Sequence, residues 1–198
     1  MKSLALVGVA TASLGLAFAT TSPTTASADV SNEPMKFVEA PSSEMDKLLA
    51  REGRAAHAKS QFDAHATIEE LAPGEYVWFD ARAVNGHTEL IVDLSDQKAY
   101  VMKSGILVGV STISSGKPGH DTPTGTFEIL EKRVEHYSNL YDDAPMPYMQ
   151  RLTWDGIALH AGSLPGYPAS HGCIRLPMEF AQELFAETKI GTTVTVTI

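Results

Sequence analysis

The sequence predicts a mainly β protein with one or two helices, in which a compact C-terminal domain follows an export signal and a short helical segment. Three observations predict this class. Short runs rich in Val, Ile, Thr and Tyr recur from residue 75 to residue 198, separated by turn-forming residues. Helix-like periodicity is confined to residues 42–62 and 179–188. An apolar stretch of signal-peptide length opens the chain.

Length and composition limit the chain to one ordinary core. It has 198 residues, of which 43% are hydrophobic and 20% charged, and its formal net charge is -9. A chain of this size buries one core with a modest appendage. The acidic balance disfavours nucleic-acid binding, which needs a basic face, and no local basic patch suits an anionic membrane surface.

Residues 1–28 have the three-part layout of a signal peptide. Lys2 precedes a mostly apolar run over residues 4–19, and polar residues then lead to Ala26-Ser27-Ala28. The apolar run is short and diluted by Gly, Ser and Thr, whereas a spanning helix needs ~20 predominantly apolar residues. We expect cleavage after Ala28, export to the periplasm or cell wall, and no transmembrane domain afterwards. The alternative is an uncleaved N-terminal anchor.

Residues 29–84 are expected to form a leader and a helical N-terminal segment. The leader, to residue 41, carries two prolines and no sustained periodicity. From Ser42 to Phe62 apolar residues recur at three- and four-residue spacing, and Ser43 stands three residues before Asp46 as a candidate cap. Gly53 weakens this helix. No chemistry is assigned to the segment.

Residues 85–198 are expected to form the main domain. After a strand at residues 75–79 and an Asn85-Gly86 turn, runs at 88–94, 99–102 and 106–114 predict an antiparallel meander, because short polar loops separate them. Further strands are predicted at residues 126–130, 157–160 and 192–198. One helix is predicted over residues 179–188, just after Pro177.

Cys173 is the only cysteine, so the chain has no internal disulfide to form. An isolated cysteine is usually a buried structural residue. Here its neighbours favour chemistry instead. His171 lies two positions before it, and His160 ends an apolar strand-like run, so either imidazole could take the thiol proton.

The residues beside Cys173 suit acyl transfer. Gly172 permits a tight backbone turn that presents the sulfur and leaves main-chain N–H groups to bind an oxyanion. Arg175 adds a fixed cation suited to a substrate carboxylate. The alternative is structural, with His160 as a satisfied core histidine, His171 and Arg175 as polar loop residues, and Gly172 as a simple turn residue.

Two motifs resemble the L,D-transpeptidase catalytic domain, also called the YkuD domain. Residues 157–177, IALHAGSLPGYPASHGCIRLP, are similar to the family signature, and residues 122–127, TPTGTF, are similar to its Thr-Pro-x-Gly-x-Phe segment. Met146-Pro147-Tyr148 precedes the strand that ends in the family's first histidine. The resemblance covers about residues 88–198 and implies an L,D-transpeptidase-type β-sandwich or barrel. The short spacing between His160 and Cys173 bears on the size of the flap over the site.

The resemblance implies a peptidoglycan enzyme that needs no cofactor and no metal. Cys173 would form a thioester with a donor tetrapeptide stem and release D-alanine, with His160 as proton donor and acceptor and the N–H groups of Gly172 and Cys173 binding the oxyanion. An amine on a second stem peptide, giving a 3→3 cross-link, or on a wall-anchored protein would accept the acyl group. Its roles would be cell wall biogenesis and cell shape. Water as acceptor would give a carboxypeptidase.

Further site residues are expected around this pair. His171 is placed in the site, orienting the loop or the substrate. The residues expected to bind the donor peptide are Arg175, Ser170, Tyr148 and Tyr167. His120 is a further candidate for the cleft, and the histidines expected to be exposed are His57, His65, His87 and His136.

Three other functions fit these residues less well. A zinc site of His160, His171 and Cys173 lacks the usual ligand spacing. A papain-like protease has its cysteine before its histidine, which is the reverse of the order here. A noncatalytic wall-binding module would be expected to have lost at least one of His160, Cys173 and Arg175.

Overall fold

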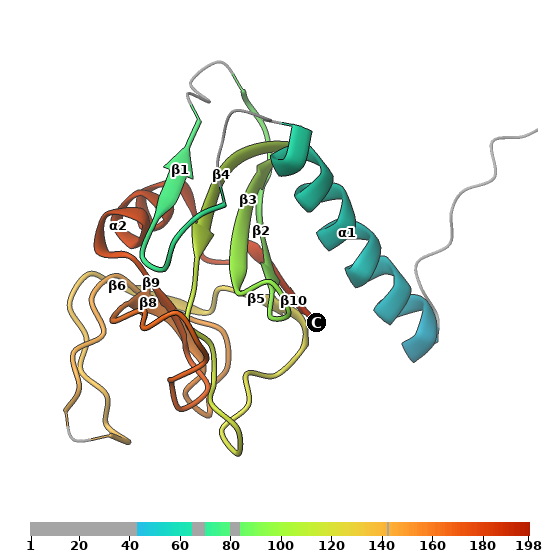
Figure 1. Cartoon of the computed structure of the whole chain (residues 1–198). Coiled ribbons are helices and arrows are strands. Elements are labelled where there is room, and N and C mark those ends of the chain that lie inside the picture. The colour runs from blue at the N-terminus through green and yellow to red at the C-terminus, as the bar shows by residue number, and fades with distance from the viewer. Residues whose placement is uncertain (1–42, 65–69, 80–83, 142) are drawn as a thin grey trace, which may run out of the picture. The chain divides into compact units, whose positions relative to one another are not determined.

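The computed structural model describes residues 43–64, 70–79, 84–141 and 143–198 (Figure 1). The predicted signal peptide, the leader and His65 lie outside the described residues. Among the described residues, no helix has the length and apolar character needed to cross a membrane. The elements in this part of the chain are α1 (Glu44–Ala64), β1 (Tyr76–Trp78), β2 (Thr88–Asp93), β3 (Lys98–Lys103), β4 (Ile106–Thr112), β5 (Gly125–Glu128), β6 (Glu131–Arg133), β7 (Met149–Arg151), β8 (Ala158–Ala161), β9 (Ile174–Leu176), α2 (Met178–Glu187) and β10 (Thr193–Thr197).

Helix α1 begins at a reciprocal cap, as its sequence predicts. The Asp46 N–H donates to Ser43 Oγ at 3.0 Å, and the Ser43 N–H donates to Asp46 Oδ2 at 3.2 Å. Two N–H groups that the helix would leave unpaired are thereby satisfied. The helix continues through Gly53 and ends at Ala64, two residues beyond the predicted end.

The larger sheet has the strand order β1-β4-β3-β2-β10-β5. Strands β2, β3 and β4 pair antiparallel, which confirms the predicted meander, and the C-terminal β10 pairs parallel to β2. Alternation along β2 places Leu90 and Val92 on one face and Ile91 on the other. All three are buried, because both faces of this sheet are covered.

Two apolar clusters cover the two faces. On one face, Leu90 and Val92 pack in a cluster with Leu159 of β8 and Phe180 of α2. On the other, Ile91 and its neighbours pack against the buried face of α1, which presents Ala55, Ala58 and Phe62. Figure 1 shows α1 and α2 on opposite sides of the sheet. The mainly β fold class with two helices is confirmed.

The smaller sheet has the order β6-β7-β8-β9 and carries the site. The sequence pattern predicted only β8 of these four strands, because β6, β7 and β9 have three residues each and too little periodicity to be recognised. Strands β8 and β9 pair in parallel, with His160 in register with Arg175. This pairing brings two of the predicted site residues together on neighbouring strands.

Candidate active site

Alternation along β8 directs His160 away from the main core. Leu159 and Ala161 belong to the core cluster, so Ala158 and His160 face the opposite side. His160 is 8% exposed, and its Nδ1 lies 2.7 Å from the carbonyl oxygen of Ala161. Because a carbonyl oxygen only accepts, Nδ1 carries the ring proton and Nε2 keeps its lone pair.

The environment of His160 keeps the imidazole neutral. Burial lowers its pKa to about 4, and the positive charges of Arg175 and His136 act in the same direction, while the hydrogen bond to Ala161 opposes them. At neutral pH the ring is therefore in the form that can accept a proton.

Gly172 makes the turn that presents Cys173. Its φ is +110°, and a Cβ at this position would lie 2.7 Å from Ile157 Cδ1, so both conformation and space require glycine. Strand β9 begins immediately after Cys173, with Ile174 and Leu176 buried in the core. The cysteine is thus placed where a well-packed strand begins.

Ser170 stabilises the loop of residues 170–173, the cysteine loop, through hydrogen bonds within it. Its Oγ accepts from the Gly172 N–H at 3.0 Å and donates to the Cys173 carbonyl at 2.6 Å. Its own N–H donates to the Ser115 carbonyl at 3.0 Å, and the residue is 1% exposed. Although Ser170 lines the cavity, its hydroxyl is engaged within the loop. The Gly172 N–H, expected to bind an oxyanion, is already donated to Ser170.

Thr122, from a separate segment of the chain, also stabilises the cysteine loop by hydrogen bonding. Its Oγ1 donates to the Gly172 carbonyl at 2.9 Å and accepts from the Gly116 N–H at 2.9 Å. The Thr-Pro-Thr-Gly segment, far from Cys173 in the sequence, therefore touches the cysteine loop directly.

The Cys173 thiol is partly buried and bonded to the backbone. Its Sγ lies 3.4 Å from the Gly156 carbonyl, to which it donates. Burial raises the pKa of Cys173, while the Ala158 N–H and the charges of Arg175 and Arg151 pull it back down. At neutral pH both cavity residues are therefore uncharged, Cys173 as a thiol and His160 as an imidazole.

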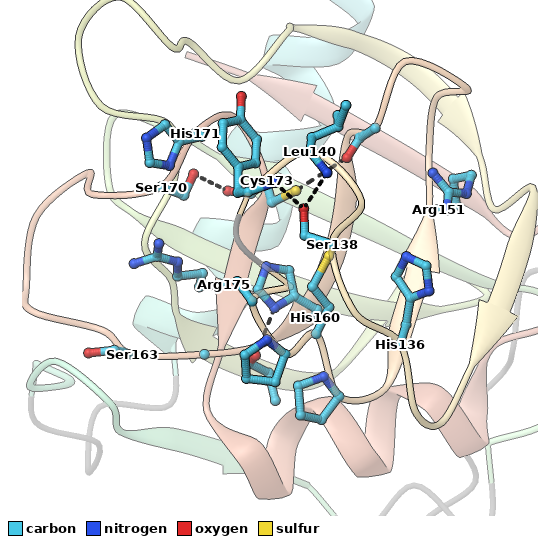
Figure 2. Close-up of a pocket in the computed structure, with 18 of the residues that line it drawn as sticks. His136, Ser138, Leu140, Arg151, His160, Ser163, Ser170, His171, Cys173 and Arg175 are labelled. Carbon is cyan, nitrogen blue, oxygen red and sulfur yellow. Dashed lines mark hydrogen bonds between the residues drawn. The ribbon is translucent and has the colours of Figure 1, made fainter.

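One cavity of about 460 Å³ unites most of the predicted site (Figure 2). Five predicted residues line it: Cys173, His160, Arg175, Ser170 and His171. Much of the remaining wall comes from a hairpin formed by residues 134–141 and 143–148. The hairpin residues in the wall are His136, Ser138, Asn139, Leu140, Tyr141, Ala144, Pro145, Met146 and Pro147.

Arg175 offers a positive charge in this cavity. Its aliphatic stem packs over Gly162, where an added Cβ would lie 3.1 Å from Arg175 Cγ and Cδ. No ion pair to Arg175 forms within the described part of the chain. Arg151, in contrast, is paired through its Nε with Glu131 Oε2 at 2.8 Å. Arg175 is therefore the cavity arginine whose charge remains for an anionic ligand.

His171 lies exposed at the rim and contacts both neighbouring loops. Its ring stacks on Tyr141 of the hairpin, with centroids 4.4 Å apart, and meets the His120 ring edge-on at 4.7 Å. Its Nε2 lies 3.1 Å from Lys117 Nζ. Desolvation lowers the pKa of His171, followed by the charges of Lys117, His120 and Arg175. His120 thus reaches the site through His171 and does not line the cavity.

Tyr148 and Tyr167, expected to bind the donor peptide, do not line this cavity. The Tyr148 ring packs edge-on against Phe185 at 5.8 Å, and the residue borders a separate depression of about 330 Å³ that is lined by both arms of the hairpin and by Met178. Tyr167 is 62% exposed, and its carbonyl accepts from Ser114 Oγ. Proximity to the motifs in sequence did not determine where these side chains point.

Sequence reasoning missed several residues that line the cavity. His136 was expected to be exposed, but it is half-buried and lines the wall; His57 and His87 are exposed as predicted. Ser138 and Arg151 were not singled out. His136 and Ser138 reach the wall through the hairpin, in which the Met146 N–H donates to the His136 carbonyl, and Arg151 reaches it from β7. No local sequence pattern signals either placement. Among the described residues, no cluster of three or more His, Cys, Asp or Glu is placed to hold a metal ion.

The fold and the site together define a two-sheet β domain that holds a cysteine and a neutral histidine in one cavity. A family model, described as the L,D-transpeptidase catalytic domain or YkuD, matches residues 87–196. The chain belongs to this family, whose members are acyltransferases that act on peptidoglycan stem peptides. The resemblance predicted from the two motifs is confirmed.

Several solved structures share this fold. An L,D-transpeptidase from Mycobacterium smegmatis is 24% identical, with a TM-score of 0.54, and the match covers 58% of this chain and 60% of that one. An L,D-transpeptidase from Stackebrandtia nassauensis is 25% identical, with a TM-score of 0.54 and coverage of 79% and 68%. L,D-transpeptidase 3 from Mycobacterium tuberculosis, in complex with a faropenem-derived adduct, is 26% identical, with a TM-score of 0.52 and coverage of 56% and 60%. No curated protein matches the sequence.

Proposed function

We propose that this protein is an exported peptidoglycan L,D-transpeptidase with Cys173 as nucleophile and His160 as proton carrier. The observation that carries the proposal is the single cavity lined by both residues, in which the Ala161 carbonyl leaves the His160 Nε2 unprotonated. The matched family supports the reaction class.

In the first half-reaction, Cys173 attacks the carbonyl carbon of the third residue of a donor tetrapeptide. The thiol turns from the Gly156 carbonyl, His160 Nε2 takes its proton, and a carbon–sulfur bond forms. The tetrahedral intermediate then expels D-alanine: the carbon–nitrogen bond breaks, and the leaving nitrogen receives the proton from His160. A thioester remains on Cys173.

The backbone N–H of Cys173 is the donor that we assign to the oxyanion. It donates to no carbonyl or side chain in the described part of the chain, whereas the Gly172 N–H donates to Ser170. Removing one oxyanion donor costs roughly 3–4 kcal/mol of transition-state stabilisation in other enzymes. This revises the expectation that both N–H groups act together.

Arg175 is proposed to bind the terminal carboxylate of the donor peptide. Its guanidinium lines the cavity and forms no ion pair with the described residues, and a planar guanidinium matches a carboxylate with two parallel hydrogen bonds. His171 and Ser170 are proposed to hold the loops of the site, the first through its contacts at the rim and the second through its bonds to Gly172 and Cys173.

In the second half-reaction, an amine attacks the thioester carbonyl and a carbon–nitrogen bond forms while His160 Nε2 takes the amine proton. The carbon–sulfur bond then breaks, and the proton returns to the sulfur of Cys173. The amine belongs to a second stem peptide, giving a 3→3 cross-link, or to a wall-anchored protein. Transfer to water would make the protein an L,D-carboxypeptidase that acts on the same stem.

We also propose the domain organisation that the sequence suggested. Residues 1–28 act as a cleaved signal peptide, residues 29–84 form the leader and the helical segment, and residues 85–198 form the catalytic domain. Intact mass of the protein secreted from an expressing cell tests the first boundary, since cleavage after Ala28 leaves Asp29 as the first residue.

Purified protein incubated with a disaccharide tetrapeptide tests the activity, with products identified by mass spectrometry. A cross-linked dimer that lacks one D-alanine supports transpeptidation, and a Cys173→Ala protein serves as the matched control. Tripeptide as the sole product would assign the carboxypeptidase activity instead. A folded wild-type protein with neither product would identify a noncatalytic wall-binding module.

A further inference from the structure

The Gly172-Cys173 peptide unit contains the N–H assigned to the oxyanion, and its carbonyl is held by Thr122. In a trans peptide, the C=O of one residue and the N–H of the next point in opposite directions from one rigid plane. The described chain contains no cis peptide bond. The hydrogen bond from Thr122 Oγ1 to the Gly172 carbonyl therefore sets the direction of the Cys173 N–H as well.

Ser170 and Thr122 hold different peptide planes of this loop. Ser170 Oγ binds the Gly172 N–H and the Cys173 carbonyl, which belong to the peptide planes before and after the one in question. Neither bond touches the plane between Gly172 and Cys173. Thr122 is the side chain that holds that middle plane.

The middle plane needs such a restraint because Gly172 permits rotation. A flip of the peptide between Gly172 and Cys173 rotates ψ of Gly172 and φ of Cys173. Gly172 has no Cβ to restrict its ψ, so no side chain opposes the flip on the Gly172 side. After a flip, the carbonyl of Gly172 would point where the N–H of Cys173 points now. The oxyanion would then meet a carbonyl oxygen in place of a donor.

Thr122 is itself held rigidly enough to serve as an anchor. It is 6% exposed, and its hydroxyl accepts from the Gly116 N–H while donating to Gly172. Gly116 lies in a tight turn, where an added Cβ would lie 2.0 Å from the His120 carbonyl oxygen. The threonine hydroxyl thus connects a constrained turn to the cysteine loop.

We propose that Thr122 is a positioning residue that preforms the oxyanion site by preventing a flip of the Gly172-Cys173 peptide. The inference rests on the proposed function, because an oxyanion forms only if Cys173 attacks a carbonyl. A positioning role predicts different effects on two reactions of Cys173, whereas a general structural role predicts the same effect on both. Loss of the Thr122 hydroxyl slows attack on a carbonyl, but it leaves the reactivity of the sulfur toward a reagent that forms no oxyanion.

Two reagents measure these reactivities in the intact protein. Faropenem reports carbonyl attack, since the thiol opens its β-lactam ring through a tetrahedral oxyanion. Iodoacetamide reports thiol displacement of iodide at a methylene carbon, which forms no oxyanion. Thr122→Val keeps the side-chain volume and removes the hydroxyl, and we expect it to slow acylation roughly 10- to 100-fold, somewhat below the effect of deleting an oxyanion donor. Alkylation should stay within about threefold of wild type. Displacement of iodide at a methylene carbon develops no oxyanion, so the Cys173 N–H does not stabilise its transition state.

Thr122→Ser restores the hydroxyl and should restore acylation. Thr112→Val is the matched control, because Thr112 Oγ1 also bridges two backbone groups, donating to the Glu75 carbonyl and accepting from the Gly74 N–H, outside the site. Thermal unfolding of each variant verifies folding, and Thr122→Ala makes the same comparison if the valine variant does not fold.

Each outcome bears on the inference. Selective loss of acylation in Thr122→Val, with rescue by serine, supports it. Unchanged acylation, or equal loss of acylation and alkylation, overturns it and leaves the proposed function standing. A wild-type protein that is alkylated but never acylated overturns the proposed function, and the inference with it.

Discussion

The Nδ1 atom of His160 lies 2.7 Å from the carbonyl oxygen of Ala161, the next residue of β8. This contact fixes the tautomer of the ring through the backbone, without a third side chain. It directs the lone pair of Nε2 away from the strand and makes His160 the better candidate base than the exposed His171.

Replacing His160 with glutamine should lower turnover roughly 10²- to 10⁴-fold, the usual contribution of a general base. Glutamine can keep a bond to the Ala161 carbonyl but cannot take a proton. His136→Gln is the matched control, because His136 lines the same cavity. If steady-state rates show equal losses for the two variants, His160 is not the proton carrier.

Stability should fall as the pH falls from about 6.5 to about 4. Burial holds the pKa of His160 at about 4 in the folded protein, below the ordinary value of 6.5. Between these values the unfolded chain binds a proton that the folded protein does not, so the stabilisation is full above pH 6.5 and is lost toward pH 4. The shift corresponds to on the order of 3 kcal/mol. Urea unfolding at both pH values should show a smaller pH dependence in His160→Gln than in wild type.

The rate of Cys173 alkylation by iodoacetamide should keep rising into the alkaline range, without a plateau near neutrality. Burial raises the pKa of the thiol above its ordinary value of 9.0, so little thiolate exists at pH 7. A flat, fast rate between pH 5 and 8 would instead reveal a preformed thiolate.

Arg175→Gln should raise KM for the donor peptide roughly 10- to 100-fold, since hydrogen bonds to charged groups contribute about 1.5–3 kcal/mol. The matched substrate is the same peptide with an amidated C-terminus, which removes the carboxylate. Wild type and variant should bind the amide alike. A variant that still discriminates between acid and amide would place the carboxylate elsewhere.

The stack between His171 and Tyr141 should couple the hairpin to the cysteine loop. Their rings lie 4.4 Å apart at an interplanar angle of 25°. Because each alanine substitution removes the same contact, the double variant should be about two- to tenfold more active than the product of the single effects predicts. Strictly multiplicative effects on kcat/KM would show that the contact does not contribute.

Much of the scaffold was predictable because local rules govern it. The reciprocal cap of Ser43 and Asp46 depends on residues three apart, and the meander of β2, β3 and β4 depends on short loops between apolar runs. The three-residue strands of the smaller sheet were not predictable, because pairing with distant partners creates them.

The same division runs through the site. The sequence by itself determined which groups are chemically able to act, Cys173, His160 and Arg175, because thiol, imidazole and guanidinium chemistry belongs to the residue type and the motif. The tertiary structure alone decided how they are held. The bond from Ser170 to Ser115, the bond from Thr122 to Gly172 and the packing of Tyr148 against Phe185 join segments far apart in the chain, and only folding sets which partners meet.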